Sequence, residues 1–370
     1  MTPIARLRQF WLDLHLWIGA GLLIVLVPIS VTGSILVWHE QLDRALYAQR
    51  YATSGPTASQ PIDAYVQAAE AAFAGRAQLT QVRLPQKAGD PVVAVGRLNG
   101  KPGPGGRPRT INAWIDPPTA RVLETAEVAK GFSMIMHQVH GTLLIPDIGR
   151  KVVGWLGWAM FVSSVTGLWL WWPRKGGFLM GLRWRRGAST LFNLHHMVGF
   201  WICLPLAVLS LTGVYISFPQ TSRAVFGLPQ QPPRAAGPGR FAPPIPAPNL
   251  SVTQAVDIAL AQQPDAGVTE VSVPTQGKTP TWRVGLRVPG AERPITLQII
   301  DTSGALKIGA GGPGGGEGGP DAVSKLMRQV HDGTGTGPVW QTIIFLGGLA
   351  PSVLSLTGVI MWLRRRPSRT

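Results

Sequence analysis

The stretch "LWIGAGLLIVLVPISVTGSILVW", residues 16–38, decides what class of protein this is. It contains no Asp, Glu, Lys or Arg, and a helix of this length, rising about 1.5 Å per residue, can cross the roughly 30 Å hydrocarbon core of a bilayer. Three further runs share both properties, namely residues 152–172, 197–219 and 338–363. The sequence therefore predicts a membrane protein with a bundle of four transmembrane helices.

The composition agrees with this class. Of 370 residues, 45% are hydrophobic and only 14% are charged, which is few charges for a soluble domain. Arg6 and Arg8 precede the first run as they would in a signal peptide. That run is longer than the apolar part of a signal peptide, and no small-residue cleavage site follows it, so we expect a retained anchor. Cys203 is the single cysteine, which excludes a disulfide framework.

The net charge of +16 would indicate nucleic-acid binding in a soluble protein. Here eleven basic residues gather in the short segments beside the helices, with Asp13 as the one acid among them. These cations are Arg6, Arg8, Arg174, Lys175, Arg183, Arg185, Arg186, Arg364, Arg365, Arg366 and Arg369. The positive-inside rule then predicts that both termini are cytoplasmic. Because the cations are explained by their place beside the membrane helices, no nucleic-acid partner is expected. The long connections, about residues 40–150 and 220–337, are predicted to lie in the periplasm of a bacterium, so the chain is a multi-pass protein of its inner (cytoplasmic) membrane.

Two internal repeats run through the chain. Each spanning run contains Ser-x-Thr-Gly, at residues 30–33, 164–167, 210–213 and 355–358. Helix packing is the plain interpretation of these small residues. His15 and His195 each lie 18 residues before the glycine of the run that contains or follows them, and His140 and His331 each lie 27 residues before theirs. The sequence is therefore predicted to be internally duplicated.

The two long connections also resemble each other. Each has a predicted helix, residues 61–74 and 251–262, the second with a capping box formed by Ser251 and Gln254. Each helix is followed by short alternating runs typical of strands, with turns at Asp116 and Asp301. Each connection is thus predicted to form a small α+β domain outside the membrane.

The predicted order along the chain follows from these features. It is spanning helix 1 in residues 1–39, an outer domain in 40–131, an outer helix with spanning helix 2 in 132–173, a basic cytoplasmic loop in 174–194, spanning helix 3 in 195–219, a second outer domain with Pro-rich and Gly-rich linkers in 220–320, an outer helix with spanning helix 4 in 321–363, and a cytoplasmic tail in 364–370.

The paired histidines are the main candidate site. His15 and His195 are expected near the cytoplasmic face, and His140 and His331 near the outer face. Two neutral imidazoles at equal depth can hold a haem iron from opposite sides, and helix bundles often build cofactor sites in this way. Gly19 and Gly199 follow the inner pair at i+4, where they either leave room for a macrocycle or serve helix packing. With both axial positions filled, such a haem transfers single electrons.

Zinc is the alternative metal. On the inner side His196 is a further candidate ligand, but no thiol or carboxylate cluster accompanies it. On the outer side His39, His137, His140 and His331 form a possible four-histidine zinc site. His39 and His137 do not follow the duplication, so they rank below His140 and His331 as haem ligands, as His196 ranks below His195. Candidate partners for haem propionates are Arg8, Arg183, Arg150 and Arg328, for which a solvated or lipid-facing role is the simpler interpretation.

Several local patterns resemble those of one family. Asp116 begins a turn of the form D-x-x-[TS]-[GA]-x-[VL], "QVHGT" follows at residues 138–142, and "TGLWLWWPR" ends the second spanning run at 166–174. This order is similar to that of the PepSY-associated transmembrane proteins, often described as iron-regulated or iron-uptake membrane proteins. The likeness covers nearly the whole chain, and its most specific part is His-Gly-Thr followed by TG-x-x-L-W-W-P-R.

The resemblance implies two PepSY-like outer domains and two b-type haems that take part in electron transport, as in haem-dependent ferric-siderophore reductases of bacterial iron uptake. The expected partners are membrane lipid, a cytoplasmic or quinol electron donor, and a periplasmic ferric chelate. Some relatives carry a flavin and nicotinamide domain; here only eight residues follow Trp362, so a separate donor is expected. The alternative interpretation is a non-redox sensor or peptidase-modulating membrane protein, because PepSY-like domains are also similar to inhibitory propeptide modules.

Overall fold

The computed structural model describes residues 2–103, 106–173, 177–187, 189–230, 241–291, 294–307 and 322–364. The chain forms two compact units. The helical unit comprises Met1–His39, Ile135–Gln230 and Pro320–Thr370, and the sheet unit comprises Glu40–Met134 and Gln231–Gly319. The predicted Gly-rich linker, half of the Pro-rich linker (residues 231–240), the loop cations Arg174 and Lys175 and the tail beyond Arg364 lie outside the described residues.

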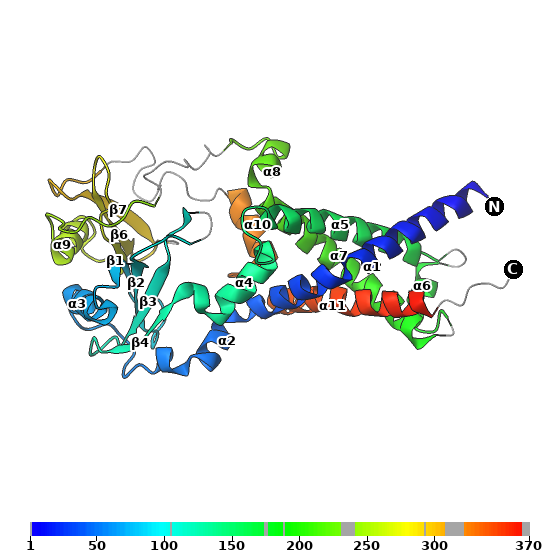
Figure 1. Ribbon diagram of the computed structural model, residues 1–370, viewed down its shortest axis with the longest axis horizontal. Helices are drawn as coiled ribbons and strands as arrows, with labels where there is room; N and C mark the ends of the chain where they lie inside the picture. The colour runs from blue at the N-terminus through cyan, green and yellow to red at the C-terminus, as the bar shows by residue number, and fades with distance from the viewer. Residues whose placement is uncertain are drawn as a thin grey trace. The chain divides into compact units, whose positions relative to one another are not determined.

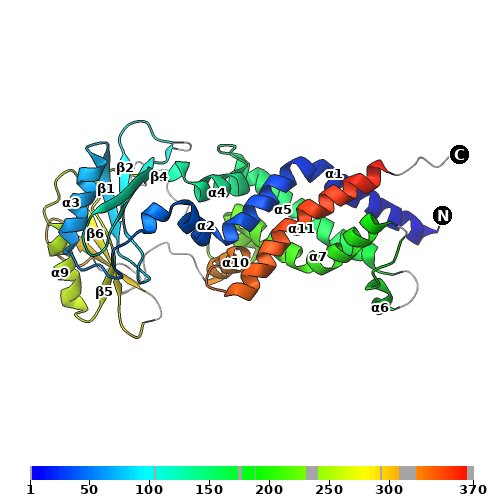
Figure 2. The same ribbon diagram turned by 90° about the horizontal axis from the view of Figure 1, so that it is seen from below.

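Four long helices form the helical unit (Figures 1 and 2). They are α1 (Pro3–Val37), α5 (Gly149–Trp171), α7 (Thr190–Ser217) and α11 (Pro338–Leu363), and each is long and apolar enough to cross a membrane. Each contains most or all of one predicted run, so the four spanning helices are confirmed. α1 and α7 both contact α5 and α11, which places α1 and α7 diagonally across the bundle.

Shorter helices lie at the two ends of this bundle. At one end α6 (Phe178–Gly181) belongs to the connection between α5 and α7, close to the start of α1 and the end of α11 (Figure 1). At the other end α4 (Phe132–Thr142) leads into α5, and α10 (Ala322–Asp332) leads into α11 and packs against α7. The same end carries α8 (Pro219–Val225). We call these the α6 end and the α4–α10 end.

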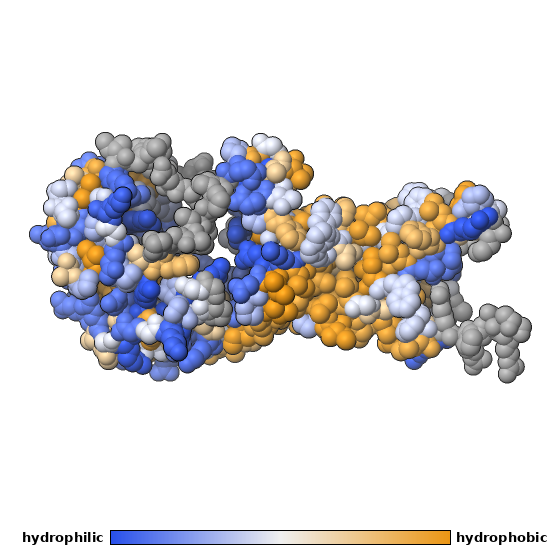
Figure 3. Space-filling view, turned by 45° about the horizontal axis from the view of Figure 1, so that its top comes forward, coloured by the Kyte–Doolittle hydropathy of each residue, from blue (hydrophilic) through white to orange (hydrophobic). Residues whose placement is uncertain are grey.

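The surface of the helical unit is apolar and its small polar residues are inside. Figure 3 shows hydrophobic residues over much of this unit. Ile24 is 84% exposed and Leu204 71% exposed, which would be unfavourable in water and is expected against lipid. The motif serines Ser30, Ser164, Ser210 and Ser355 are all buried. These small residues let the helices approach closely, as the packing interpretation predicts.

The sheet unit is built on one antiparallel sheet with the strand order β4-β3-β2-β1-β5-β6-β7. The strands are β1 (Ala77–Arg83), β2 (Val92–Leu98), β3 (Thr110–Ile115), β4 (Val122–Glu127), β5 (Gly267–Ser272), β6 (Thr281–Arg287) and β7 (Ile295–Ile300). β1 and β5 come from different connections and pair in the middle, with Val82 opposite Val271. Two separate outer domains were expected; instead the two segments share one sheet, because each would otherwise leave a strand edge with unpaired backbone groups.

Two helices form the hydrophobic core with this sheet. α3 (Ile62–Phe73) contributes Tyr65 and Phe73, which are fully buried, and α9 (Val252–Gln262) packs on β5, β6 and β7, where Trp282 is buried. Ile62 contacts the core of both segments. The predicted capping box at Ser251 is present. The remaining short helices of the unit are α2 (His39–Leu46) and the 3-10 turns Ala48–Tyr51 and Val128–Lys130.

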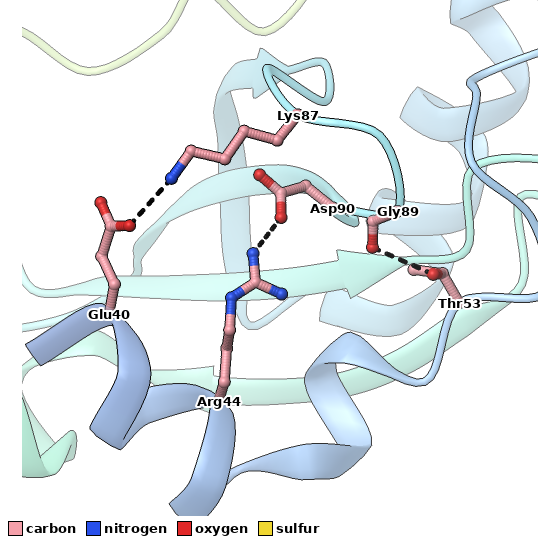
Figure 4. A network of polar contacts seen from close by, with 6 residues as sticks. All are labelled: Glu40, Arg44, Thr53, Lys87, Gly89 and Asp90. Atoms are coloured by element: carbon pink, nitrogen blue, oxygen red, sulfur yellow. Dashed lines mark hydrogen bonds and ion pairs between the residues drawn. The ribbon is translucent and has the colours of Figure 1, made fainter.

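Polar contacts tie α2 to the sheet. Figure 4 shows Glu40 and Arg44 on α2 directed toward the loop between β1 and β2. Glu40 pairs with Lys87 at 3.0 Å, and Arg44 pairs with Asp90. Glu40 and Lys87 are largely exposed, so their pair stabilises the contact only weakly.

Two buried aspartates hold the turns that were predicted at Asp116 and Asp301. Asp116 follows β3 and accepts hydrogen bonds from the backbone and hydroxyl of Ser54 and from Thr119. Asp301 follows β7 and accepts from Asn249 and from the indole of Trp282 at 2.8 Å. Each carboxylate thus ties the end of a strand to the segment that precedes α3 or α9.

These bonds outweigh burial in setting the acidity of both groups. Burial alone would raise the pKa of Asp116, but the hydrogen bonds from Ser54 and Thr119 lower it below its usual value. Asp301 behaves in the same way. Burial would raise its pKa, but the hydrogen bonds from Asn249 and Trp282 lower it below its usual value. Both side chains are therefore carboxylates at neutral pH.

The first prediction concerns acid stability. Because the folded pKa values lie below those of the unfolded chain, the carboxylates stabilise the sheet unit above about pH 4, and this stability is lost as the pH falls through the folded pKa values. The loss is at most about 1.4 kcal/mol per pH unit for each group. Hydrogen exchange of β3 and β7, corrected for intrinsic rates, should show it. In an Asp116→Asn, Asp301→Asn variant the same strands should be less protected at neutral pH and should change little between pH 5 and pH 3; an unchanged slope would contradict the assignment.

Candidate functional site: two histidine pairs

The helical unit brings four histidines together as two pairs. At the α6 end His15 on α1 faces His195 on α7, with ring centroids 6.5 Å apart and ring planes at 87°. At the α4–α10 end His140 faces His331, with centroids 6.0 Å apart and planes at 42°. Imidazole nitrogen binds metals at about 2 Å, so two imidazoles on opposite sides of one ion have centroids roughly 6 Å apart. Both pairs have the separation that a shared metal requires.

Threonines of neighbouring helices hold the pair at the α6 end. His15 Nδ1 lies 3.1 Å from Thr166 Oγ1, and His195 Nδ1 lies 2.9 Å from Thr357 Oγ1. Each threonine hydroxyl donates its own proton to a carbonyl of its helix, Thr166 to Val162 at 2.9 Å and Thr357 in the same way. The threonine oxygen therefore accepts from Nδ1–H, and Nε2 of each histidine keeps its lone pair.

At the α4–α10 end, backbone carbonyls accept the hydrogen bonds from Nδ1 of the two histidines. His140 Nδ1 lies 2.9 Å from Ile29 O, and His331 Nδ1 lies 3.1 Å from both Leu209 O and Thr212 Oγ1. A carbonyl can only accept, so Nδ1 carries the proton in both rings. All four histidines thus direct an unprotonated Nε2 away from their acceptor, as metal-binding histidines do.

The glycine of each Ser-x-Thr-Gly motif lies against one of these rings. A Cβ at Gly167 would lie 3.1 Å from His15 Cε1, and one at Gly358 would lie 3.4 Å from His195 Cε1. At the α4–α10 end, a Cβ at Gly33 would lie 2.6 Å from His140 Cε1, and one at Gly213 would lie 3.1 Å from His331 Cε1. The motifs therefore position histidines as well as packing helices, which the sequence analysis did not foresee.

Each histidine contacts a different motif glycine from the one used to measure its spacing in the sequence. In the sequence, the glycine that follows His15 on the same helix is Gly33, and the one that follows His140 is Gly167. In the structure His15 lies against Gly167 and His140 against Gly33. The equal spacings marked equivalent residues correctly but did not identify the residues in contact.

A cavity of about 550 Å³ separates the diagonal helices at the α6 end. His15, His195, Gly19 and Gly199 line it. A Cβ at Gly19 would meet no atom within 4 Å, and one at Gly199 only Leu354 at 3.9 Å. The two glycines thus border open space beside the histidine pair instead of a packed helix contact.

His196 has a different role from His195. Its Nε2 accepts a hydrogen bond from Arg186, and its ring stacks on Phe192 at 5.5 Å and on Trp171 at 5.9 Å. It lines the same cavity but does not face His15 as His195 does.

The predicted arginines divide into two groups. Arg8 lines the cavity and donates to Leu170 O at 2.6 Å, whereas Arg183 is exposed and does not line it. Arg150 and Arg328 are exposed at the α4–α10 end. Arg186 also lines the cavity and was missed, because its loop has no repeat or periodicity that marks one of several cations.

The chain was compared with known protein families. The family described as PepSY-associated TM region matches residues 12–365. The chain belongs to this family. The match spans both histidine pairs and all four Ser-x-Thr-Gly motifs. No curated protein matches the sequence.

In this member of the family the four histidines of the α4–α10 end do not gather around one point. His39 and His137 are exposed, and His39 Nδ1 bonds to Leu36 O at 2.9 Å. Within the described part of the chain, no three His, Cys, Asp or Glu side chains gather as they would around a metal ion. The four-histidine zinc alternative is therefore not supported.

His140 and His331 are uncharged at neutral pH. Burial, and to a smaller extent the neighbouring His140, lowers the pKa of His331 to about 4. Burial also lowers the pKa of His140. Neutral imidazole is the form that binds metals.

The second prediction tests the contact between glycine and ring. Gly33→Ala places a methyl group against His140 and should lower the free energy of unfolding by about 1–3 kcal/mol, the usual result of overpacking. Gly21→Ala on the same helix is the control, because a Cβ there meets nothing within 4 Å. Thermal unfolding in detergent measures both, and equal midpoints for the two variants would contradict the contact.

Proposed function

We propose that this protein carries electrons across the bacterial inner membrane through two b-type haems to a ferric chelate in the periplasm. His15 and His195 hold one haem iron, and His140 and His331 hold the other. The observation that carries the proposal is the pairing of four imidazoles at metal-sharing distance, each with Nδ1 bonded and Nε2 available.

The residues present fit a haem. Each pair offers two imidazoles and, in the part of the chain that the structure describes, no third protein ligand, which would suit the iron of a haem. At the α6 end the 550 Å³ cavity and the open space beside Gly19 and Gly199 provide the volume for that macrocycle. The cavity is largely apolar, as binding sites for large flat ligands are.

The two pairs lie at different depths of the bundle. His140 is held at Ile29, which is 14 residues beyond His15 on the same helix. At about 1.5 Å per residue this is about 21 Å along α1, most of the apolar thickness of a bilayer. Sites at these depths support a path that begins near one face of the membrane and ends near the other.

The direction of the chain in the membrane rests on its charges. Arg8, Arg183, Arg185, Arg186 and Arg364 lie at the α6 end, which makes it the cytoplasmic end by the positive-inside rule. His140 and His331 are then near the periplasm, and the sheet unit is periplasmic. The proposal includes an internal duplication, supported by the matching contacts of the two halves: α1 and α5 hold His140 and His15, and α7 and α11 hold His331 and His195.

The chemistry follows from the ligand set. A bound haem would supply one-electron transfer between ferric and ferrous iron. The electron comes from a cytoplasmic reductant or a membrane quinol. The terminal step reduces Fe(III) to Fe(II) in a siderophore-type chelate, whose hard oxygen ligands hold the ferrous ion less tightly. The threonines and carbonyls at Nδ1 orient the ligands and tune their basicity.

The alternative function is a non-redox sensor or peptidase-modulating protein. The two functions differ in a direct observation. Purified protein with an intense haem absorption band that shifts on addition of dithionite supports electron transfer, and reduction of an external ferric hydroxamate by proteoliposomes with an internal reductant supports the proposed acceptor. Colourless protein without bound iron supports the sensor.

The third prediction concerns haem content. His195→Ala should remove one haem per chain and leave the other, because the α4–α10 pair is untouched. His196→Ala is the matched control, since this neighbouring ring faces Arg186 instead of His15, and it should keep both haems. Pyridine haemochrome analysis gives the stoichiometry. Two haems in the His195→Ala protein would contradict the assignment of this pair.

The fourth prediction concerns the hydrogen bond to Nδ1. Thr357→Val removes the acceptor of His195 while keeping the shape of the side chain, which makes the imidazole a poorer donor to iron. Outer-shell losses of this kind weaken metal binding by about 10–100-fold. If the oxidised form bears most of that loss, the reduction potential of one haem rises by about 60–120 mV.

Redox titration monitored by absorbance measures this potential. Thr342→Val on the same helix is the control, because the Thr342 side chain is exposed and its hydroxyl donates to Pro338 O of its own helix. Identical potentials in wild type and the Thr357→Val variant would show that the threonine does not tune the site.

A further inference from the structure

A buried hydrogen-bond donor lies in the wall of the cavity near the α6 end. Trp171 is only 3% exposed and lines the cavity, yet its indole N–H has no acceptor among the described residues. Its ring is fixed on several sides: the benzo edge lies against Gly181, and one face stacks on Phe200 at 4.1 Å. Buried indole N–H groups usually have a partner, so this donor indicates a missing acceptor.

Arg186 lines the same part of the cavity. Its guanidinium lies 5.7 Å from the centre of the Trp171 ring, and Nη1 donates to Trp171 O at 2.9 Å and to His196. Among the described residues, its Nε and Nη2 have no hydrogen-bond partner, so a guanidinium edge remains for a ligand. Arg8 is a second cation in the cavity wall.

The described lining of the cavity contains no Asp or Glu. Asp13 is the acidic residue nearest to Arg8 in the sequence. It is exposed on α1 and accepts a hydrogen bond from the side chain of Gln9 at 2.8 Å. A partly buried site with two guanidinium groups and an indole donor, but no carboxylate of its own, is electrostatically suited to an anion.

The position of Arg186 is set before any ligand binds. Asn193 is buried and accepts from the backbone of Arg186 at 3.0 Å and of Gly187 at 2.9 Å, while its own amide donates to Gly187 O. Asn193 lies two residues before His195 on α7. The loop is therefore attached to the helix that carries the metal-binding histidine, which holds the guanidinium at a fixed place in the same cavity.

We infer that Trp171 and Arg186, together with Arg8, bind a carboxylate at the α6 end of the cavity. Resting on the proposed function, this carboxylate is a propionate of the haem held by His15 and His195. The indole N–H and the free edge of Arg186 donate to its oxygens, and Arg8 adds positive charge. Trp171 and Arg186 thereby set the orientation of the macrocycle. The phosphate of an anionic lipid is the other source of an anion with this chemistry.

The experiment compares haem b with its dimethyl ester, in which both carboxylates are blocked. The full chain with His331→Ala, which removes the site at the other end, is produced without haem, purified in an uncharged detergent and titrated with each pigment. Haem b should bind at least about tenfold more tightly than the ester, since each charge-assisted hydrogen bond is a strong one. Trp171→Phe and Arg186→Gln should each bring the ratio toward one, mainly by weakening haem b.

The matched controls come from the same segment of the chain. Trp172 is 56% exposed and Arg183 is exposed, and neither lines the cavity. Trp172→Phe and Arg183→Gln should therefore leave the ratio between haem b and the ester unchanged. The absorption spectrum of the bound pigment shows whether both axial histidines are retained in every variant.

Three outcomes would overturn the inference. Equal binding of haem b and the ester by the wild-type site would show that no carboxylate is recognised. Equal weakening of both pigments by Trp171→Phe and Arg186→Gln would show that these residues serve only the fold. Equal binding of the two pigments, with phosphatidylglycerol bound at this site, would identify a lipid phosphate as the anion. The propionate is supported if haem b binds more than about tenfold more tightly than the ester and phosphatidylglycerol displaces neither pigment. A wild-type chain that takes up no haem at all contradicts the proposed function itself, and the inference with it.

Discussion

The hydrogen bond between each histidine Nδ1 and an acceptor on another helix is the interaction on which the candidate site depends. It fixes three properties at once: the tautomer, the direction of the ring and the depth of Nε2 in the bundle. A glycine of the Ser-x-Thr-Gly motif beside each ring makes the bond possible, because at Gly33 even a methyl group would displace His140. The motif thus serves close helix packing and the orientation of the histidine rings with the same residues.

The bundle combines tight and open packing. Neighbouring helices approach closely where serines and glycines meet, while the diagonal helices α1 and α7 leave a cavity between them. The lining of such a cavity lacks the dispersion contacts of a packed core. A ligand that fills it therefore stabilises the folded chain in proportion to its affinity and concentration, so binding and stability are expected to be coupled in this protein.

The sheet unit shows how far local patterns extend. The strands, the helices α3 and α9, the capping box at Ser251 and the turns at Asp116 and Asp301 follow from short-range periodicity and turn chemistry. The pairing of β1 with β5 does not follow from such local patterns. It joins strands that are almost 190 residues apart in the sequence, and it forms only where the edge strands of the two segments meet. A single seven-stranded sheet in place of two domains is the result.

The sequence by itself determined the four spanning helices, the membership of the histidines in two sets and the equivalence of the two halves in spacing, because these depend on run length and register along the chain. Spacing along the chain also ranked His195 above its neighbour His196 as a candidate ligand. Only the tertiary structure decided that Thr166 and Thr357 hold the rings of His15 and His195 and that Arg186 enters the cavity. The physical reason is that adjacent helical residues differ in direction by about 100°, and which direction meets a partner is set by how the helices pack against one another.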